Sequence, residues 1–223
     1  MVVAHPNIES SLGNRGIIEN FKQLHPDAEI DELYKLYPDF KIDVKKEQEK
    51  LVRADFIILQ FPMYWYNAPA LMRQWFESVL EHGFAYGSKG KALEGKKLLL
   101  SITTGSPVEA YKEGGIQNYT LEDLTKGFHQ LANLCSMRWA GYIATGNFVF
   151  FLRDKPEELK KMKERISQHA EELSAKVKGK YNYHYLHKYH SVHTPLYISL
   201  TKFDFYFSAN YSTFKISCKI IYI

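Results

Sequence analysis

Cysteine is scarce in this sequence, and so are the features of exported or membrane-spanning proteins. The two cysteines, Cys135 and Cys218, are too few for the disulfide framework of a small secreted domain. The first residues lack a basic segment followed by an apolar run, as a secretory signal would have. Charged residues interrupt each apolar stretch before it reaches the roughly 20 residues that a membrane span needs. The sequence therefore predicts a cytoplasmic protein without a transmembrane segment.

Motifs of several common protein classes are also absent. There is neither a Walker loop nor a G-x-G-x-x-G turn, which disfavours a nucleoside triphosphate or a Rossmann-type NAD site. The absence of G-x-S-x-G, H-E-x-x-H and Cys-x-x-Cys disfavours hydrolases. In residues 1–180, basic and acidic side chains are nearly equal in number. No nucleic-acid partner is expected, because such partners need a concentrated basic surface.

Short apolar runs predict the strands of a sheet. Val2–Ala4, Phe56–Phe61 and Leu98–Ile102 each lead into polar, glycine or proline residues, as buried parallel strands do. A fourth strand is expected over Tyr142–Ala144, continuing toward Phe148–Phe151. A fifth strand, in which apolar and polar residues alternate and which is more exposed, is expected over Ala28–Leu33.

Between these runs, apolar residues recur at helical spacing. Helices are predicted over 71–80, over 121–135 and from Asp154 to Val177, the last with a proline near its first turn. Thr120 and Asp123 are spaced like a capping box before the second. Alternating strands and helices specify a doubly wound α/β fold with a five-stranded parallel sheet and helices on both faces. Such sheets bind ligands at the carboxyl ends of their strands.

Three segments follow predicted strands and therefore qualify as ligand-binding loops. The first, residues 4–14, brings His5, Ser11 and Asn14 to the start of a helix, where free N–H groups favour a phosphate. The alternative is that Ser10 or Ser11 only caps that helix.

The second segment, residues 60–69, places Tyr64, Trp65 and Tyr66 at the end of a buried strand. Aromatic faces there suit stacking on a planar heterocycle, and Pro62 restrains the backbone so that nearby N–H groups can face ring heteroatoms. The alternative is that the three aromatics serve packing or an interface between proteins.

The third segment, Thr103–Pro107, offers small side chains and N–H donors to the polar edge of a ligand, although many strand-to-helix turns use similar residues. Tyr111 follows on a connection whose length is typical of a binding loop.

Together these segments resemble the NAD(P)H:quinone oxidoreductase family of flavodoxin-like flavoproteins, which includes general-stress oxidoreductases and the ancillary subunits of bacterial potassium efflux systems. The resemblance covers roughly residues 1–178. Five stretches carry it: Ala4-His5-Pro6-Asn7, Gln60-Phe61-Pro62-Met63-Tyr64-Trp65-Tyr66, Gly83-Phe84-Ala85-Tyr86-Gly87, Leu93-Glu94-Gly95-Lys96-Lys97 and Thr103-Thr104-Gly105.

The resemblance implies a homodimer that binds FMN, or FAD in some members, and passes two electrons from NADPH or NADH to a quinone by a ping-pong hydride transfer. Its phosphate would be held by His5, Ser11, Leu12, Gly13 and Asn14. The ring would be lined by Pro62, Met63, Tyr64 and Trp65, and its polar edge by Thr103, Thr104, Gly105 and Ser106. Tyr111 matches a catalytic loop tyrosine, but Gln117 stands where animal members have a histidine, which puts a proton relay in doubt.

The resemblance leaves a second function open. The same flavoprotein would act as a regulatory subunit in peripheral contact with a potassium efflux transporter. A one-electron shuttle is a weaker third reading, because such carriers are usually acidic and this chain is not.

Residues 181–223 are expected to form a poorly ordered tail outside the main domain of residues 1–180. They are rich in tyrosine, histidine and phenylalanine and contain no glycine or glutamate. Four histidines recur at every third position, His184, His187, His190 and His193. A metal site is the alternative interpretation, disfavoured because the histidines have no packed scaffold and no acidic residue among them.

Overall fold

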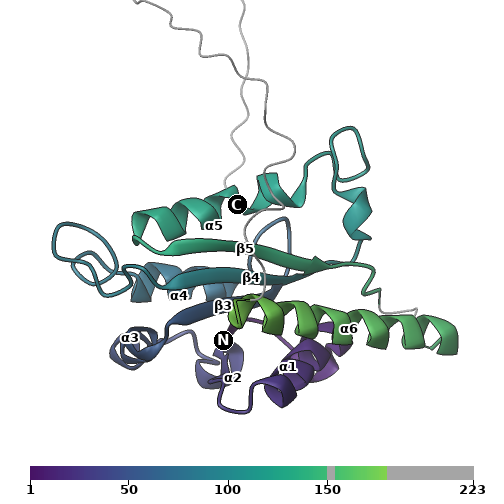
Figure 1. Ribbon diagram of the computed structural model, residues 1–223, viewed down its shortest axis with the longest axis horizontal. Helices are drawn as coiled ribbons and strands as arrows, with labels where there is room; N and C mark the ends of the chain where they lie inside the picture. The colour runs from purple at the N-terminus through teal and green to yellow at the C-terminus, as the bar shows by residue number, and fades with distance from the viewer. Residues whose placement is uncertain (150–153, 180–223) are drawn as a thin grey trace, which may run out of the picture. The chain divides into compact units, whose positions relative to one another are not determined.

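The computed structural model describes residues 1–149 and 154–179. They contain a five-stranded parallel sheet in the order β2-β1-β3-β4-β5, of which β3, β4 and β5 are labelled side by side in Figure 1. Every pair of neighbouring strands in it is parallel. This order is that of the flavodoxin-like doubly wound fold, so the predicted fold class is confirmed. The strands are β1 (Val2–Val3), β2 (Asp31–Glu32), β3 (Phe56–Pro62), β4 (Lys97–Thr103) and β5 (Arg138–Thr145).

The described residues contain six α-helices and two 3-10 turns, and the three helices predicted from periodicity are among them. The capping box before the second is present, because the side chains of Thr120 and Asp123 each accept the other's backbone N–H. The third has its proline at the first turn. The helices are α1 (Leu12–Leu24), α2 (Leu33–Leu36), α3 (Val44–Arg53), α4 (Ala70–Val79), α5 (Leu121–Leu134) and α6 (Pro156–Val177), and the turns are η1 (Ile8–Ser10) and η2 (Val108–Ala110).

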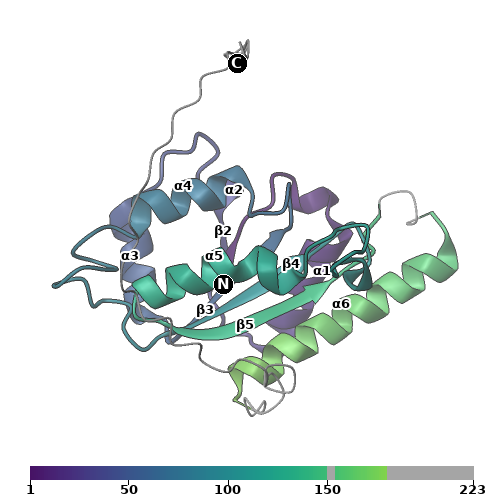
Figure 2. The same cartoon turned by 90° about the horizontal axis from the view of Figure 1, so that it is seen from above.

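Helices cover both faces of the sheet, and the side chains of the central strands alternate between the two. On one face, α1 and α6 lie side by side (Figure 1) over Ile58 and Leu99. On the other, helices α2 to α5 pack against Leu59 and Leu100, and Figure 2 shows α5 lying along β5. Because both faces are buried, β3 and β4 are nearly continuous apolar runs.

Three strands, β1, β3 and β4, match their predicted bounds to within one residue at each end, and the other two differ by more. β5 begins at Arg138 and ends at Thr145 instead of continuing toward Phe148. Asn147 adopts a positive φ of 64°, and its N–H and that of Phe148 donate to the carbonyls of Ser106 and Thr104, which takes the chain out of the sheet. β2 is shorter than Ala28–Leu33, since Leu33 already begins α2. Residues 150 and 151, the tail 181–223 and its four histidines lie outside the described residues.

Candidate functional site

A cavity of about 300 Å³ lies at the carboxyl edge of the sheet, between the loops that follow β1, β3 and β4. This is the position that doubly wound sheets use for ligands. Most of the residues predicted to bind a cofactor line it, and Trp65, Ser106 and Tyr111 do not. The lining consists of His5, Ser10, Ser11, Leu12, Gly13, Asn14, Pro62, Met63, Tyr64, Thr103, Thr104, Gly105, Phe148 and Met162.

A larger cavity, of about 480 Å³, opens at the opposite edge of the sheet beside Met1, His25 and Phe56. As far as the described residues define it, its lining contains no hydroxyl or amide side chain. Charged side chains do line it, but Lys50 pairs with Asp31 and Glu47, and Arg53 pairs with Glu29. The smaller cavity at the carboxyl edge, with its hydroxyl and amide groups, is therefore the better candidate for a specific ligand.

The corner of this cavity beside α1 is rich in hydrogen-bond donors. Ser11 is the N-cap of α1, and its Oγ accepts the backbone N–H of Asn14 at 3.2 Å. The predicted capping role is therefore present, in a residue that also lines the cavity. The amides of Leu12 and Gly13 follow in the first turn, where a helix leaves its N–H groups unpaired. A side chain at Gly13 would place its Cβ 3.0 Å from the Phe148 ring, so the backbone is closely covered there.

His5 presents a donor to the same region. Its Nδ1 accepts the backbone N–H of Asn7 at 3.1 Å, so the neutral ring carries its proton on Nε2. The His5 ring lies 6.2 Å from that of Tyr64, centre to centre. The loops after β1 and β3 thus meet across the cavity mouth.

The aromatic segment forms a tight hairpin at this mouth. Tyr64 and Asn67 exchange backbone hydrogen bonds of 2.9 and 3.0 Å. Trp65 and Tyr66 form the tip with φ values of 48° and 64°, the signs that a type I′ turn requires. Tyr64 lines the cavity, whereas the Trp65 side chain is 94% exposed. In this chain Trp65 therefore lies in solvent and not against the predicted ring position.

Three hydrogen bonds hold the loop after β4 in place. The Thr104 N–H donates to the Thr145 carbonyl at 3.0 Å, and the Thr104 hydroxyl donates to the Ser106 carbonyl at 2.7 Å. Gln117 donates from Nε2 to the Ser106 hydroxyl at 2.8 Å. Gln117 therefore fixes the position of the Ser106 side chain.

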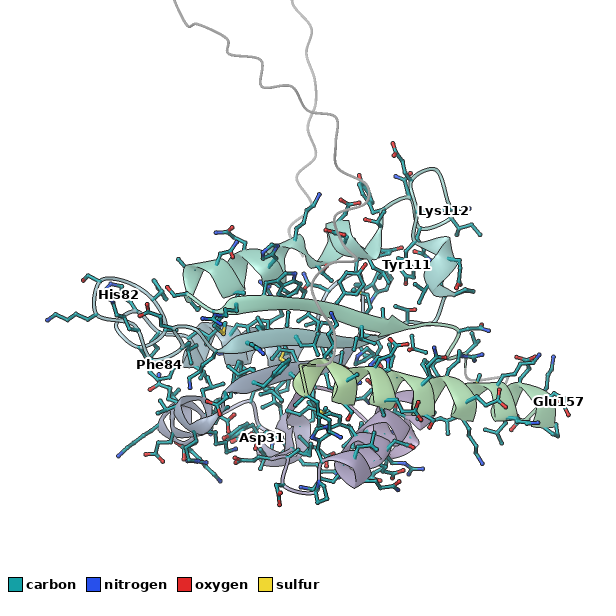
Figure 3. The ribbon with its side chains drawn as sticks, in the orientation of Figure 1. Asp31, His82, Phe84, Tyr111, Lys112 and Glu157 are labelled. Atoms are coloured by element: carbon teal, nitrogen blue, oxygen red, sulfur yellow. The ribbon has the colours of Figure 1, made fainter. Side chains whose placement is uncertain are left out.

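Tyr111 lies on the long connection between β4 and α5, just after η2 (Figure 3). Burial raises the pKa of its hydroxyl, and Tyr66 acts in the same direction, while hydrogen bonding with Thr104 and Ser106 opposes the shift. At neutral pH the phenol is therefore protonated, beside the loop that borders the cavity.

A buried chain of polar side chains runs beneath the cavity, and the sequence reasoning missed most of it. Asn14 Nδ2 contacts Thr103 Oγ1 at 2.9 Å and Ser11 Oγ at 3.2 Å, and Gln60 Nε2 contacts Asn14 Oδ1 at 2.7 Å. Ser101 Oγ donates to Gln60 Oε1. We call these residues, with His169 and Thr145, the polar chain.

His169 ends the polar chain from helix α6. Its Nε2 lies 2.7 Å from Ser101 Oγ, and its Nδ1 lies 2.7 Å from Thr145 Oγ1. The side chain is 1% exposed, and burial lowers its pKa to about 3, so the ring is neutral at physiological pH. The available sequence signal was Gln60 and Ser101 inside apolar strands, because buried polar groups need hydrogen-bond partners.

Comparison with known proteins places the chain in a family. A family model described as having a flavodoxin-like fold matches residues 1–170. The chain is 45% identical over 139 residues to the NAD(P)H oxidoreductase YrkL of Bacillus subtilis, covering 62% of this chain and 79% of that protein. It is 42% identical to the glutathione-regulated potassium-efflux system ancillary protein KefG of Cronobacter sakazakii, covering 62% and 75%.

Solved structures agree with these relatives. The general stress protein 14 of Treponema denticola, determined in complex with FMN, superposes with a TM-score of 0.71 at 30% identity, covering 78% of this chain and 97% of that one. An NADPH-quinone reductase of P. pentosaceus superposes with a TM-score of 0.60 at 31% identity, covering 76% and 95%. In the described part of this chain, no helix has the length and hydropathy to cross a membrane. The chain belongs to the flavodoxin-like family that includes these NAD(P)H oxidoreductases, general stress proteins and potassium-efflux ancillary proteins.

Proposed function

We propose that this chain is an FMN-dependent NAD(P)H oxidoreductase that delivers two electrons to a quinone or a similar acceptor. The observation that carries the proposal is the cavity at the carboxyl edge, where phosphate-type donors, aromatic surface and a polar loop share one lining. Relatives named for NAD(P)H oxidation and quinone reduction, and a neighbour solved with FMN, support the same function.

The donor-rich corner suits the terminal phosphate of a mononucleotide. Ser11 and the amides of Leu12 and Gly13 would hold its oxygens, with Asn14 behind them and His5 at the side. The positive end of the α1 dipole favours the same charge. FMN is proposed in preference to FAD because the similar general stress protein 14 of Treponema denticola was determined in complex with FMN.

Pro62, Met63 and Tyr64 line the wall on which a flat ring would rest, and Thr104 and Gly105 form its polar edge. The resemblance put Thr103 at that edge, but its Oγ1 lies 2.9 Å from Asn14 Nδ2, so Thr103 would border the phosphate corner instead. A bound flavin would supply the redox chemistry, accepting hydride from NAD(P)H and returning two electrons to the acceptor. Trp65 and Ser106 lie outside the lining, so any contact they make would come at its rim. Tyr111 would hold a proton on its hydroxyl close to that polar edge, available as a hydrogen-bond donor.

A second copy of the chain would complete the site. The side chains of Trp65, Ile116 and Tyr119 are 94%, 93% and 59% exposed, and they lie on the connections after β3 and β4 that also border the cavity. Such apolar exposure is typical of surfaces that associate. A homodimer covering them would bring Trp65 from solvent to the edge of the site.

The first prediction concerns colour. The purified protein is expected to be yellow, with a flavin absorption spectrum, and to release FMN on denaturation. Turnover of NADH or NADPH with menadione would then test the reaction. A colourless protein that takes up neither FMN nor FAD would contradict the proposed function.

The second prediction concerns phosphate recognition. Thr103→Val keeps the side-chain shape but removes a hydroxyl that lines the cavity, so FMN affinity should fall about 5- to 20-fold. Riboflavin, which lacks the phosphate, should bind the variant and the wild type equally. The matched control is Thr125→Val, since the Thr125 hydroxyl is also buried but donates to Leu121 within α5. Equal losses for FMN and riboflavin would contradict the phosphate assignment.

A regulatory role is the second candidate function, supported by the similarity to KefG. In that case the flavoprotein would bind a potassium efflux transporter at the membrane surface. Co-purification with membranes that contain the transporter, together with slow NAD(P)H turnover in its absence, would favour this role. Fast turnover by the isolated protein would favour the enzyme.

A further inference from the structure

The hydrogen bonds of the polar chain run in one direction, which follows from the amide orientations of Gln60 and Asn14 and from the number of protons that each member carries. Ser101 has a single hydroxyl proton, and it donates that proton to Gln60 Oε1. Ser101 Oγ must therefore accept from His169 Nε2, 2.7 Å away, so that nitrogen carries the ring proton. Because the His169 ring is neutral, Nδ1 has no proton and accepts from the Thr145 hydroxyl at 2.7 Å.

The same direction continues to the cavity. Gln60 donates from Nε2 to Asn14 Oδ1, so Asn14 Nδ2 is left to donate to Thr103 Oγ1 and Ser11 Oγ. Ser11 Oγ also accepts the backbone N–H of Asn14, which makes it an acceptor twice. Within residues 1–149 and 154–179 no acceptor takes the hydroxyl proton of Ser11 or Thr103, and both residues line the cavity. Both protons are therefore available to a ligand.

The opposite direction would remove two hydroxyl donors from the cavity. If His169 carried its proton on Nδ1, then Nε2 would accept from Ser101, and the Gln60 and Asn14 amides would each turn over. Asn14 Oδ1 would then face Ser11 and Thr103, and their hydroxyls would donate to it instead of into the cavity. Both directions satisfy the buried groups, and only one leaves the Ser11 and Thr103 hydroxyl protons for a ligand.

We propose that His169 is a positioning residue that sets the direction of the polar chain, so that Ser11 and Thr103 donate to a phosphate monoester in the cavity. The ligand class rests on the proposed function, whereas the direction rests on the amide orientations of Gln60 and Asn14. The hydrogen-bond partners of His169, Ser101 and Thr145, do not line the cavity, so it would act through Ser101, Gln60 and Asn14.

The test compares FMN with riboflavin, because the two differ only in the phosphate. Dissociation constants are measured by quenching of flavin fluorescence for the full chain and for His169→Leu and His169→Gln. In His169→Leu the preference for FMN over riboflavin should fall about tenfold, because Ser101 loses its donor. His169→Gln keeps an amide N–H that can donate to Ser101, and it should retain the preference within about twofold. Equal loss of both flavins in His169→Leu, or equal behaviour of the two variants, would overturn the proposal.

Two further measurements separate the possible failures. Ser174→Ala changes another buried hydroxyl of α6, one that contacts His25 instead of the polar chain, and it should leave the preference unchanged. Nitrogen-15 chemical shifts of His169 in the wild-type chain, with inorganic phosphate as the ligand, report the tautomer even if His169→Leu fails to fold. An Nε2–H tautomer supports the proposal, and an Nδ1–H tautomer overturns it. A wild-type chain that binds neither flavin would reject the proposed function, and the tautomer would still decide the direction.

Discussion

Replacing Glu47 by glutamine is expected to lower the free energy of unfolding by about 3 kcal/mol, one of the two largest effects of a single change in this chain. Glu47 is 1% exposed, and its carboxylate accepts hydrogen bonds from three side chains. Tyr37 Oη donates at 2.8 Å, Lys50 Nζ at 2.7 Å and Trp75 Nε1 at 2.9 Å. Because all three partners are donors, the amide NH₂ of glutamine would face a donor in either orientation. Chemical denaturation followed by circular dichroism measures the loss.

The matched control is Glu49→Gln, on the same helix α3 but exposed. It should change the free energy of unfolding by less than about 0.5 kcal/mol. Lys50 also lies 2.5 Å from Asp31, so part of the buried charge remains paired in Glu47→Gln. If the two variants lost equal stability, the buried carboxylate would not be the cause.

The second large effect is acid sensitivity caused by His169. Burial lowers its pKa in the folded protein to about 3, whereas the unfolded chain has an ordinary value near 6.5. Between these values the unfolded state binds the extra proton, so stability is complete above about pH 6.5 and falls as the pH drops toward 3. Each pH unit in this window lowers the free energy of unfolding by about 1.4 kcal/mol, or about 3 kcal/mol between pH 6 and pH 4.

Denaturation curves at several pH values for the wild type and His169→Gln isolate this contribution. Asp31 acts in the opposite direction, because burial raises its pKa and its protonation on acidification favours the folded state. Subtracting the free energy of unfolding of His169→Gln from that of the wild type at each pH cancels the contributions of Asp31 and the other carboxyls, which are the same in both proteins. Parallel curves for both proteins would show that His169 does not cause the acid sensitivity.

The fold was readable from the sequence where local patterns and tertiary packing agree. Phe56–Phe61 and Leu98–Ile102 became the central strands because both faces of a doubly wound sheet are covered. The capping box at Thr120 fixed the start of α5 for a purely local reason. Helix α3 escaped prediction because its residues are mostly charged, and only Glu47 and Leu51 are buried.

The candidate site was only partly readable. His5 and Asn14 belong to one local segment, and their arrival beside Thr103 follows from the parallel order of β1, β3 and β4. The position of Trp65 depends on a left-handed backbone that no local rule predicts for an aromatic residue. His169 lies 155 residues after Asn14 in the numbering of the chain and joins it only through Gln60 and Ser101. Hydrogen bonds between residues so far apart produce no periodic pattern in the sequence from which they could be predicted.

The hairpin tip at Trp65 and Tyr66 has a consequence for laboratory evolution. Each non-glycine residue in a left-handed conformation costs roughly 1 kcal/mol, and an Asn-Gly pair would adopt the same turn with less strain. A library screened for heat resistance alone would therefore enrich small residues at these two positions. A library screened for both heat resistance and turnover would keep the aromatic pair if a ligand or a second subunit contacts it. Comparing the two enriched populations would reveal the use of these side chains without any assumption about what touches them.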